Sequence, residues 1–162
     1  MCYIVIMAKN MRRKDREKPR AFALAVVDKC PYAVMATVNP DGTPYCIPLS
    51  IAREAAWLYF HSARDGHKIE NLMFQNRVCI TCVGEQKAIP GEFALEYESA
   101  VINGTAFEIM DRDEKINALA LISRRYTPES MPSFDEAIKR ELSQVSVWKI
   151  RIEEISGKGR KL

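Results

Sequence analysis

The sequence lacks the short motifs that mark the commonest nucleotide-binding and hydrolytic sites. It has no G-x-G-x-x-G and no G-x-x-x-x-G-K-[ST], so neither a Rossmann dinucleotide fold nor a P-loop is predicted. The two histidines, His61 and His67, stand in no recognisable pattern with a serine or cysteine nucleophile, which argues against triad hydrolysis. It also has no internal repeat and no low-complexity segment. An enzyme built on this chain therefore needs a cofactor to supply the reactive group.

Features of export, membrane insertion or metal binding are also scarce. Residues 1–8 are apolar, but they are too few to span a membrane and have no basic start. The five cysteines are odd in number and irregularly spaced, which favours reduced thiols and a cytoplasmic protein. Cys79 and Cys82 form one C-x-x-C without a second, and three positions apart in a strand they point to opposite faces. We interpret them as core residues and expect no metal site.

Positive charge is concentrated at the two ends of the chain. Residues 9–20 hold seven basic and two acidic residues, and residues 158–162 hold three basic ones. Residues 21–157, in contrast, hold fourteen basic and nineteen acidic residues. A nucleic-acid binder usually carries its charge on a folded face with interleaved aromatics, so we interpret both ends as solvated and expect no nucleic-acid partner.

The length of 162 residues fits a single domain with a substantial core. Met11 and the charged run after it look like a more natural beginning than Met1. We therefore expect residues 1–10 to be a dispensable, disordered extension and residues 11–162 to form the domain.

Apolar periodicity predicts a chain in which strands predominate. Strands are predicted at 32–38, 44–51, 57–60, 78–83, 97–110 and 145–155, and helices at 19–29, 68–75, 111–126 and 134–142. Residues 84–96 are predicted to be a long loop. Short turns such as Asn39-Pro40-Asp41-Gly42 join neighbouring strands, which favours an antiparallel sheet or barrel with flanking helices over a parallel sheet.

The stretch from Trp57 to Leu72 carries the clearest indication of a binding site. An aromatic strand gives way to a small, polar and basic bend, and apolar residues then recur at helical spacing. A helix start offers free N–H groups, Gly66 lets a ligand approach the backbone, and Lys68 adds a full positive charge. This pattern predicts a site for one phosphate group, with an ordinary solvated turn as the alternative. Pro44 and Pro48 interrupt the strand at 44–51 and leave main-chain groups free for a flat ligand.

Five pieces of the sequence, taken in order, resemble one family. They resemble the nitroimidazole-resistance branch of the pyridoxamine 5′-phosphate oxidase-like flavoproteins. The pieces are Met11–Glu17, Gly42–Leu49, Tyr59–Ala63 with Gly66 and Lys68, Tyr97–Val101 with Gly104, and Ser156–Lys158.

The resemblance implies a six-stranded antiparallel split β-barrel that forms a homodimer with FMN at each subunit interface. By this resemblance the flavin ring is contacted by Tyr45, Ile47, Pro48 and Leu49. Ribityl, ring-edge and phosphate contacts are implied for His61, Ser62, Ala63 and Lys68. Glu98 and Ser99 are implied to reach the flavin of the neighbouring subunit.

The implied activity is an FMN-dependent oxidoreductase that reduces nitroimidazoles or other nitroaromatic compounds and thereby confers antibiotic resistance. No side chain is assigned a catalytic role, although His61 is a candidate substrate contact. The alternative is a non-catalytic flavin or haem carrier or sensor, with His61 as the candidate haem ligand. His67 and Ala100 depart from the basic residue and valine usual in the branch. The C-terminus lacks the arginine-bearing segment of the true oxidases, which argues against vitamin-B6 oxidation.

Overall fold

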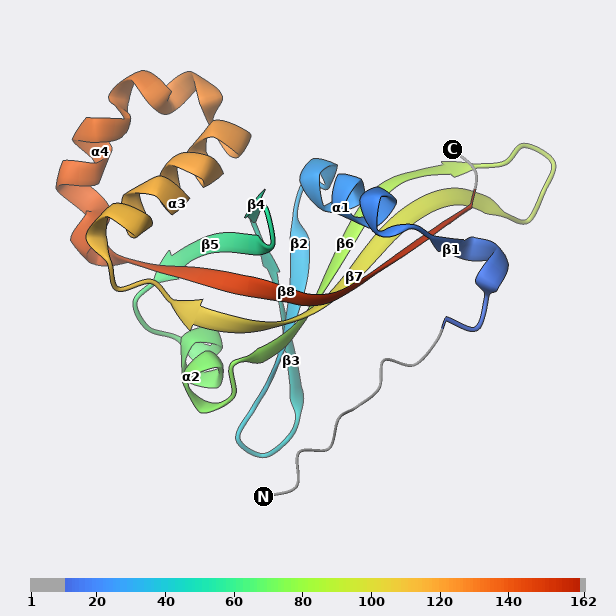
Figure 1. Ribbon diagram of the computed structural model, residues 1–162, viewed down its shortest axis with the longest axis horizontal. Coiled ribbons are helices and arrows are strands. Elements are labelled where there is room, and N and C mark those ends of the chain that lie inside the picture. The colour runs from blue at the N-terminus through green and yellow to red at the C-terminus, as the bar shows by residue number, and fades with distance from the viewer. Residues whose placement is uncertain (1–10, 161–162) are drawn as a thin grey trace.

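The computed structural model describes residues 11–160 (Figure 1). The prediction that residues 1–10 are a disordered extension concerns residues outside this range. Helices and short 3-10 turns of the described chain flank a β-sheet. The α-helices are α1 (Arg20–Lys29), α2 (His67–Phe74), α3 (Arg112–Tyr126) and α4 (Phe134–Glu141), and the 3-10 turns are η1 (Lys14–Arg16), η2 (Pro128–Ser133) and η3 (Leu142–Gln144).

All strand pairs are antiparallel, as predicted. Six longer strands form the body of the sheet: β2 (Ala33–Val38), β3 (Pro44–Leu49), β5 (Trp57–Ala63), β6 (Arg77–Ala88), β7 (Leu95–Glu108) and β8 (Val145–Arg160). Two short strands, β1 (Glu17–Lys18) and β4 (Ala52–Glu54), pair at its margins. The strand order is β3-β2-β6-β7-β8-β5-β4, with β1 also on β8. The mainly β, antiparallel fold with flanking helices is therefore confirmed.

The sheet is a barrel that hydrogen bonds do not close. Its terminal strands, β3 and β4, follow each other in the chain and are separated only by Ser50 and Ile51, yet they do not pair. Pro44 and Pro48 lie in β3, where their missing N–H groups cost little because a terminal strand has one unpaired edge. This opening leaves the edge of β3 accessible.

The core occupies the inside of the sheet beneath α1. Alternate residues of each strand point inward, including Met35, Phe60 and Ile80, which are fully buried together with Val27 of α1. A second apolar cluster lies on the other side of β5, where Tyr59 packs under α3. Figure 1 shows α3 and α4 together at one end of the molecule. The two cores fix β5, and with it the bend that follows, from both faces.

The long loop predicted at residues 84–96 is wrong. β6 runs through to Ala88 and β7 starts at Leu95, so only residues 89–94 form the turn. A register shift between Val83 and Gln86 lets β6 continue through its polar residues. We call residues 84–98 the arm; it extends at the end of the molecule opposite α3 and α4 (Figure 1). β8 likewise continues past the predicted end at residue 155 to Arg160.

Two local features explain where α3 begins and where β7 is irregular. Asp111 caps α3, since its Oδ1 accepts the N–H of Glu114 at 2.8 Å. The register of β7 against β8 shifts between Asn103 and Gly104, which is a β-bulge or similar irregularity. None of the helices within residues 11–160 has the length and apolar character needed to cross a membrane.

Candidate functional site

The bend between β5 and α2, residues 61–68, has the geometry of a helix start that no side chain caps. β5 ends at Ala63 and α2 begins at His67. Gly66 occupies the N-cap position with φ of 106°, a conformation that favours glycine, and it has no side chain with which to bond the helix. A Cβ placed on Gly66 would have no heavy atom within 4 Å. The space beside this backbone is therefore open to a ligand.

The hydrogen bonds of the first turn show which N–H groups of α2 are already bonded within the helix. The N–H groups of Ile69 and Glu70 donate to the carbonyl of Gly66 at 2.8 and 3.1 Å. Those of His67 and Lys68 come before the first helical bond and have no acceptor within the helix. They coincide with the positive end of the helix dipole, so an anion is favoured at this position.

Lys68 lies in the first turn of α2, and its positive charge acts on His61. Partial burial lowers the pKa of His61 first, and the nearby positive charge of Lys68 lowers it further. His61 is therefore held neutral to lower pH than a solvated histidine. The sequence predicted that both residues belong to one site, and the structure brings the positive charge of Lys68 within range of the His61 ring.

The first residue of α2 packs directly against β3. The rings of Tyr45 and His67 are stacked, with 4.0 Å between their centroids and 28° between their planes. Behind them, the hydroxyl of Thr37 donates to the Tyr45 carbonyl at 3.3 Å. The bend, predicted to bind a phosphate group, and the proline-interrupted strand β3 are separate in the sequence, but they therefore lie side by side in the structure.

A polar network that the sequence analysis missed fixes α2 against the β2–β3 turn. Asn71 is 1% exposed, and its amide donates to Asn39 Oδ1 at 2.7 Å and to Thr37 Oγ1 at 3.0 Å. His67 Nε2 donates to the same Asn39 oxygen at 2.7 Å. Asn71 lies between Ile69 and Leu72, both buried, so a polar residue on the apolar side of the helix was the available indication.

The remaining predicted contacts near β3 and β5 are divided between the faces of the sheet. Ile47 and Leu49 point toward the core, whereas Pro48 lies on the outer face and is exposed. Ser62 is 7% exposed, and its hydroxyl donates to the Ala63 carbonyl at 2.8 Å. A phosphate contact from the Ser62 side chain would therefore require this hydroxyl to turn away from its present acceptor.

Glu98 and Ser99 lie far from the bend of the same chain. Both regions pair with β8: Ser62 lies opposite Ser146, and Glu98 lies opposite Gly159. Ser146 and Gly159 are thirteen residues apart along this strand, a distance of about 40 Å. The predicted contact of Glu98 and Ser99 with a flavin would accordingly be made to a second copy of the chain.

Glu98 is also engaged within its own chain. The side chain is 4% exposed, and its Oε1 accepts the N–H of Glu85 at 2.9 Å and pairs with Lys29 Nζ at 2.6 Å. It lies against Gly84, where a Cβ would collide with it. The carboxylate thus holds the irregular start of the arm as well as being a predicted cofactor contact.

The site at the bend suits a phosphate ester with an attached flat ring. The uncapped helix start, the open space at Gly66 and Lys68 provide for one phosphate group. Tyr45 and the edge of β3 provide an aromatic surface and main-chain groups for a ring. Without a nucleophile or paired acid and base, the chain would bind and orient such a group, which would supply the reactivity. The residue-by-residue contacts stay predictions.

Comparisons with known proteins show which family and which solved structures the chain resembles. The sequence model described as pyridoxamine 5′-phosphate oxidase matches residues 19–159. A candidate 5-nitroimidazole antibiotic resistance protein from Bacteroides thetaiotaomicron superposes with a TM-score of 0.73 at 28% identity, over 87% of this chain and 84% of that one. A comparison with curated protein sequences finds no match.

Two more distant solved structures share the fold. An FAD- and haem-binding protein from Mycobacterium smegmatis has a TM-score of 0.77 at 20% identity, over 91% of this chain and 74% of that one. A flavocytochrome from Azotobacter vinelandii has a TM-score of 0.74 at 21% identity, over 94% and 73% of the two chains. With the family match spanning nearly all of the described residues, this chain belongs to the pyridoxamine 5′-phosphate oxidase-like family, whose fold is the split β-barrel.

Proposed function

We propose that the protein is an FMN-dependent oxidoreductase that binds the flavin phosphate at the start of α2. The observation that carries the proposal is the uncapped turn at Gly66, which has open space beside it and Lys68 in the first helical turn. Family membership favours a flavin over other phosphate esters. Because FMN ends in a single phosphate, one helix start and one lysine match its charged end.

In this proposal the residues of the chain bind and orient, and the bound flavin supplies the electron transfer. Lys68 and the first N–H groups of α2 hold the phosphate. The edge of β3 lies along the ring, with Tyr45 fixed by its stack on His67. His61, kept neutral by partial burial and by Lys68, can accept or donate a hydrogen bond to a substrate without repelling the lysine.

Nitroaromatic compounds, nitroimidazoles in particular, are the substrates we propose. The support is the structural neighbour at 28% identity that is described as a candidate 5-nitroimidazole resistance protein. Complete reduction of the nitro group to an amine would make such a drug harmless, whereas reduction that stops at a radical would not. Product identification by mass spectrometry after anaerobic turnover distinguishes these two courses.

We propose that the protein acts as a homodimer. An outer face of the sheet supports this, because Pro48, Val34, Thr81 and Val101 are register neighbours across four strands, and none of them is charged. Val101 and the nearby Val83 are 38% and 52% exposed. A second copy covering this face would bury these residues, and it is also what the predicted role of Glu98 requires.

The absorbance spectrum of the purified protein is the first test. We expect yellow protein with flavin absorbance, or, if the cofactor is lost during purification, recovery of that absorbance on titration with FMN. Extraction and mass determination then identify FMN or FAD. Protein that neither carries nor binds a flavin would contradict the proposal.

A haem carrier on the same barrel is the second candidate. The observation that favours it is His61, whose lowered pKa keeps its ring in the neutral form that ligates iron. Haem titration would then give a Soret band that His61→Ala removes. FMN binding without any Soret band would exclude this candidate.

A further inference from the structure

The two basic ends of the chain, predicted to be solvated separately, meet on one face. β1 pairs with the end of β8, with Glu17 opposite Lys158, so the residues just before β1 lie beside the last residues of β8. The arm lies beside these two segments, so that the three of them surround a space. We call the space between them the basic hollow; it measures about 740 Å³ and is lined by Arg12, Arg13, Arg16, Ala88, Glu92, Phe93, Ala94, Leu95, Tyr97, Lys158 and Arg160.

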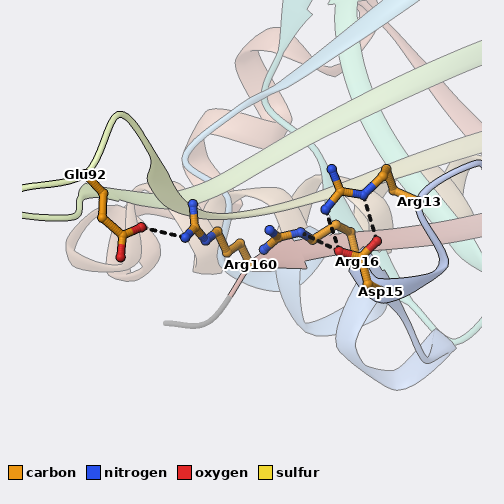
Figure 2. A network of polar contacts seen from close by, with 5 residues as sticks. All are labelled: Arg13, Asp15, Arg16, Glu92 and Arg160. Carbon is orange, nitrogen blue, oxygen red and sulfur yellow. Dashed lines mark hydrogen bonds and ion pairs between the residues drawn. The ribbon is translucent and has the colours of Figure 1, made fainter.

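Ion pairs hold several of these side chains in place (Figure 2). Arg13 binds Asp15 through two nitrogens, with Nε at 2.7 Å from Oδ1, and Arg16 Nε lies 3.1 Å from Oδ2 of the same carboxylate. On the arm side, Arg160 Nη2 lies 2.7 Å from Glu92 Oε2. The hydrogen bond from Arg13 lowers the pKa of Asp15 to about 2, so this carboxylate stays charged and keeps orienting both arginines.

The hollow keeps an excess of positive charge after these pairs are formed. Five cations line it, whereas Asp15 and Glu92 supply two negative charges, which leaves a net charge of +3. Arg12 and Lys158 have no ion-pair partner among residues 11–160 and are exposed. Four of the five cations are arginines, whose planar guanidinium groups bind phosphate oxygens in pairs.

Size and lining favour a small molecule over a nucleic-acid strand. A volume of about 740 Å³ falls in the usual range for small-ligand pockets, roughly 300–1,000 Å³. The flanking aromatic residues are Phe93, which is fully exposed, and Tyr97, which lies close enough to Arg13 to affect its pKa. Arginine and aromatic faces together suit a nucleotide base linked to phosphate groups.

We propose that the basic hollow binds the adenosine phosphate end of a pyridine dinucleotide that supplies electrons, and that it favours the 2′-phosphorylated form. The choice of a pyridine dinucleotide rests on the proposed flavin function, because a flavin oxidoreductase needs an electron donor. The dinucleotide loses a hydride, which is two electrons and one proton, and leaves oxidised; the flavin takes up the hydride and one further proton from water.

The place of the hollow fits this role. Tyr97 lines it, and the next two residues, Glu98 and Ser99, are those predicted to reach the flavin of the neighbouring subunit. Ser99 is joined to the hollow through Lys158, whose carbonyl accepts the Ser99 hydroxyl at 3.4 Å. A dinucleotide held by its adenosine phosphates in the hollow would extend along this strand toward that flavin.

The test is a calorimetric titration of the full chain with 2′,5′-ADP, which is the adenosine phosphate part of the donor and cannot transfer electrons. The variant Arg12→Gln/Lys158→Gln removes two exposed charges of the hollow and breaks no ion pair within residues 11–160. The matched control, Arg124→Gln/Lys139→Gln, removes one exposed arginine and one exposed lysine, neither of them in an ion pair with another described residue, from α3 and α4 at the other end of the molecule. We expect at least a roughly tenfold loss of affinity in the first variant and little change in the control.

Three results would overturn the proposal. The first is absence of 2′,5′-ADP binding, and the second is equal weakening in both variants, which would indicate attraction to net charge alone. The third is affinity for inorganic phosphate or 5′-AMP that equals the affinity for 2′,5′-ADP, because neither base nor 2′-phosphate would then contribute. Flavin absorbance, recorded on the same samples, reports separately on the proposed function, so each idea can fail without the other.

In steady state, the hollow variant should raise KM for NADPH at least severalfold, leave kcat nearly unchanged and retain its flavin absorbance. A fall in kcat with unchanged KM would contradict binding in the hollow.

Discussion

The bend before α2 and the basic hollow both suit a phosphate group, but the chain assembles them in different ways. The bend draws its glycine, lysine and free N–H groups from residues 61–68, eight consecutive positions. The hollow combines Arg12, Arg13 and Arg16 with Lys158 and Arg160, about 140 residues away in the chain. A contiguous site is visible in the sequence, whereas a site formed by two ends depends on a strand pairing.

The two regions also differ in how they are supported. The bend lies between two apolar cores and is fixed by buried hydrogen bonds through Asn71. The hollow is held by exposed ion pairs, which typically contribute little to stability. We therefore expect changes to the buried contacts or the backbone of the bend to affect folding and cofactor together, whereas changes to exposed side chains, at the bend or at the hollow, should affect binding alone.

The largest expected effect is the loss of the Asn71 network. Asn71→Ala removes the donor to the buried Thr37 hydroxyl and one of the two donors to Asn39 Oδ1, and it opens a small cavity, so we expect the unfolding free energy to fall by about 3 kcal/mol. Denaturant unfolding followed by circular dichroism measures it. The control is Asn117→Ala, on the exposed face of α3, where we expect a change within about 0.5 kcal/mol. Equal losses in the two variants would show that the network does not support the bend.

Next in size is the effect of Lys68 on the cofactor. Lys68→Ala removes a charge-assisted contact to phosphate, so we expect FMN affinity to fall roughly tenfold to a hundredfold with little change in stability. Fluorescence quenching of FMN on titration with protein gives the affinity. Lys139→Ala, an exposed lysine on α4, is the control and should bind FMN as the wild type does. Unchanged affinity in Lys68→Ala would place the phosphate elsewhere.

The sequence predicted those parts of the molecule in which neighbouring residues decide the outcome. The strand predicted at residues 32–38, the helix predicted at residues 111–126 and the glycine of the bend depend on local patterns, and each is present in the structure. The arm was missed because residues 84–88 are polar and resemble a loop, while their strand structure depends on pairing with β7 and on Glu98 holding the bulge.

The hollow was missed for the same physical reason. Charge counted along the chain places two basic tails far apart, and only the pairing of β1 with β8 brings them together. The Asn39–Asn71 contact is likewise between a turn and a helix that no local pattern connects. Whether Tyr45, Ile47, Pro48, Leu49 and the other predicted flavin contacts act as expected stays a prediction.

A smaller effect is expected from alanine substitution at two glycines with positive φ, of which only Gly66 lies at the proposed phosphate site. Gly66→Ala introduces a Cβ at φ of 106° and Gly91→Ala does so at φ of 78°, with open space around both. We expect each to lower unfolding free energy by about 1 kcal/mol. Because Gly66 caps α2 and Gly91 lies at the tip of the arm, Gly66→Ala alone should also weaken FMN binding. Equal FMN affinity in the two variants would mean that the backbone at Gly66 does not meet the phosphate.

The smallest expected effect concerns the titration of His61. Its pKa lies below the ordinary value of 6.5, so as pH falls through 6.5 the unfolded chain takes up a proton that the folded chain does not. Stability is therefore full above pH 6.5 and declines below it, and His61→Gln should lack this part of the decline in unfolding experiments between pH 8 and pH 5.

Nuclear magnetic resonance titration of the His61 ring then connects the bend to its ligand. Lys68→Ala should raise the pKa of His61 only in part, because burial is the larger cause of its lowering. Addition of FMN should raise it in the wild type, since a phosphate near Lys68 offsets the positive charge that His61 experiences. No change in the His61 titration on FMN binding would show that the phosphate lies away from this charge, while 2′,5′-ADP in the basic hollow should leave the titration unaltered.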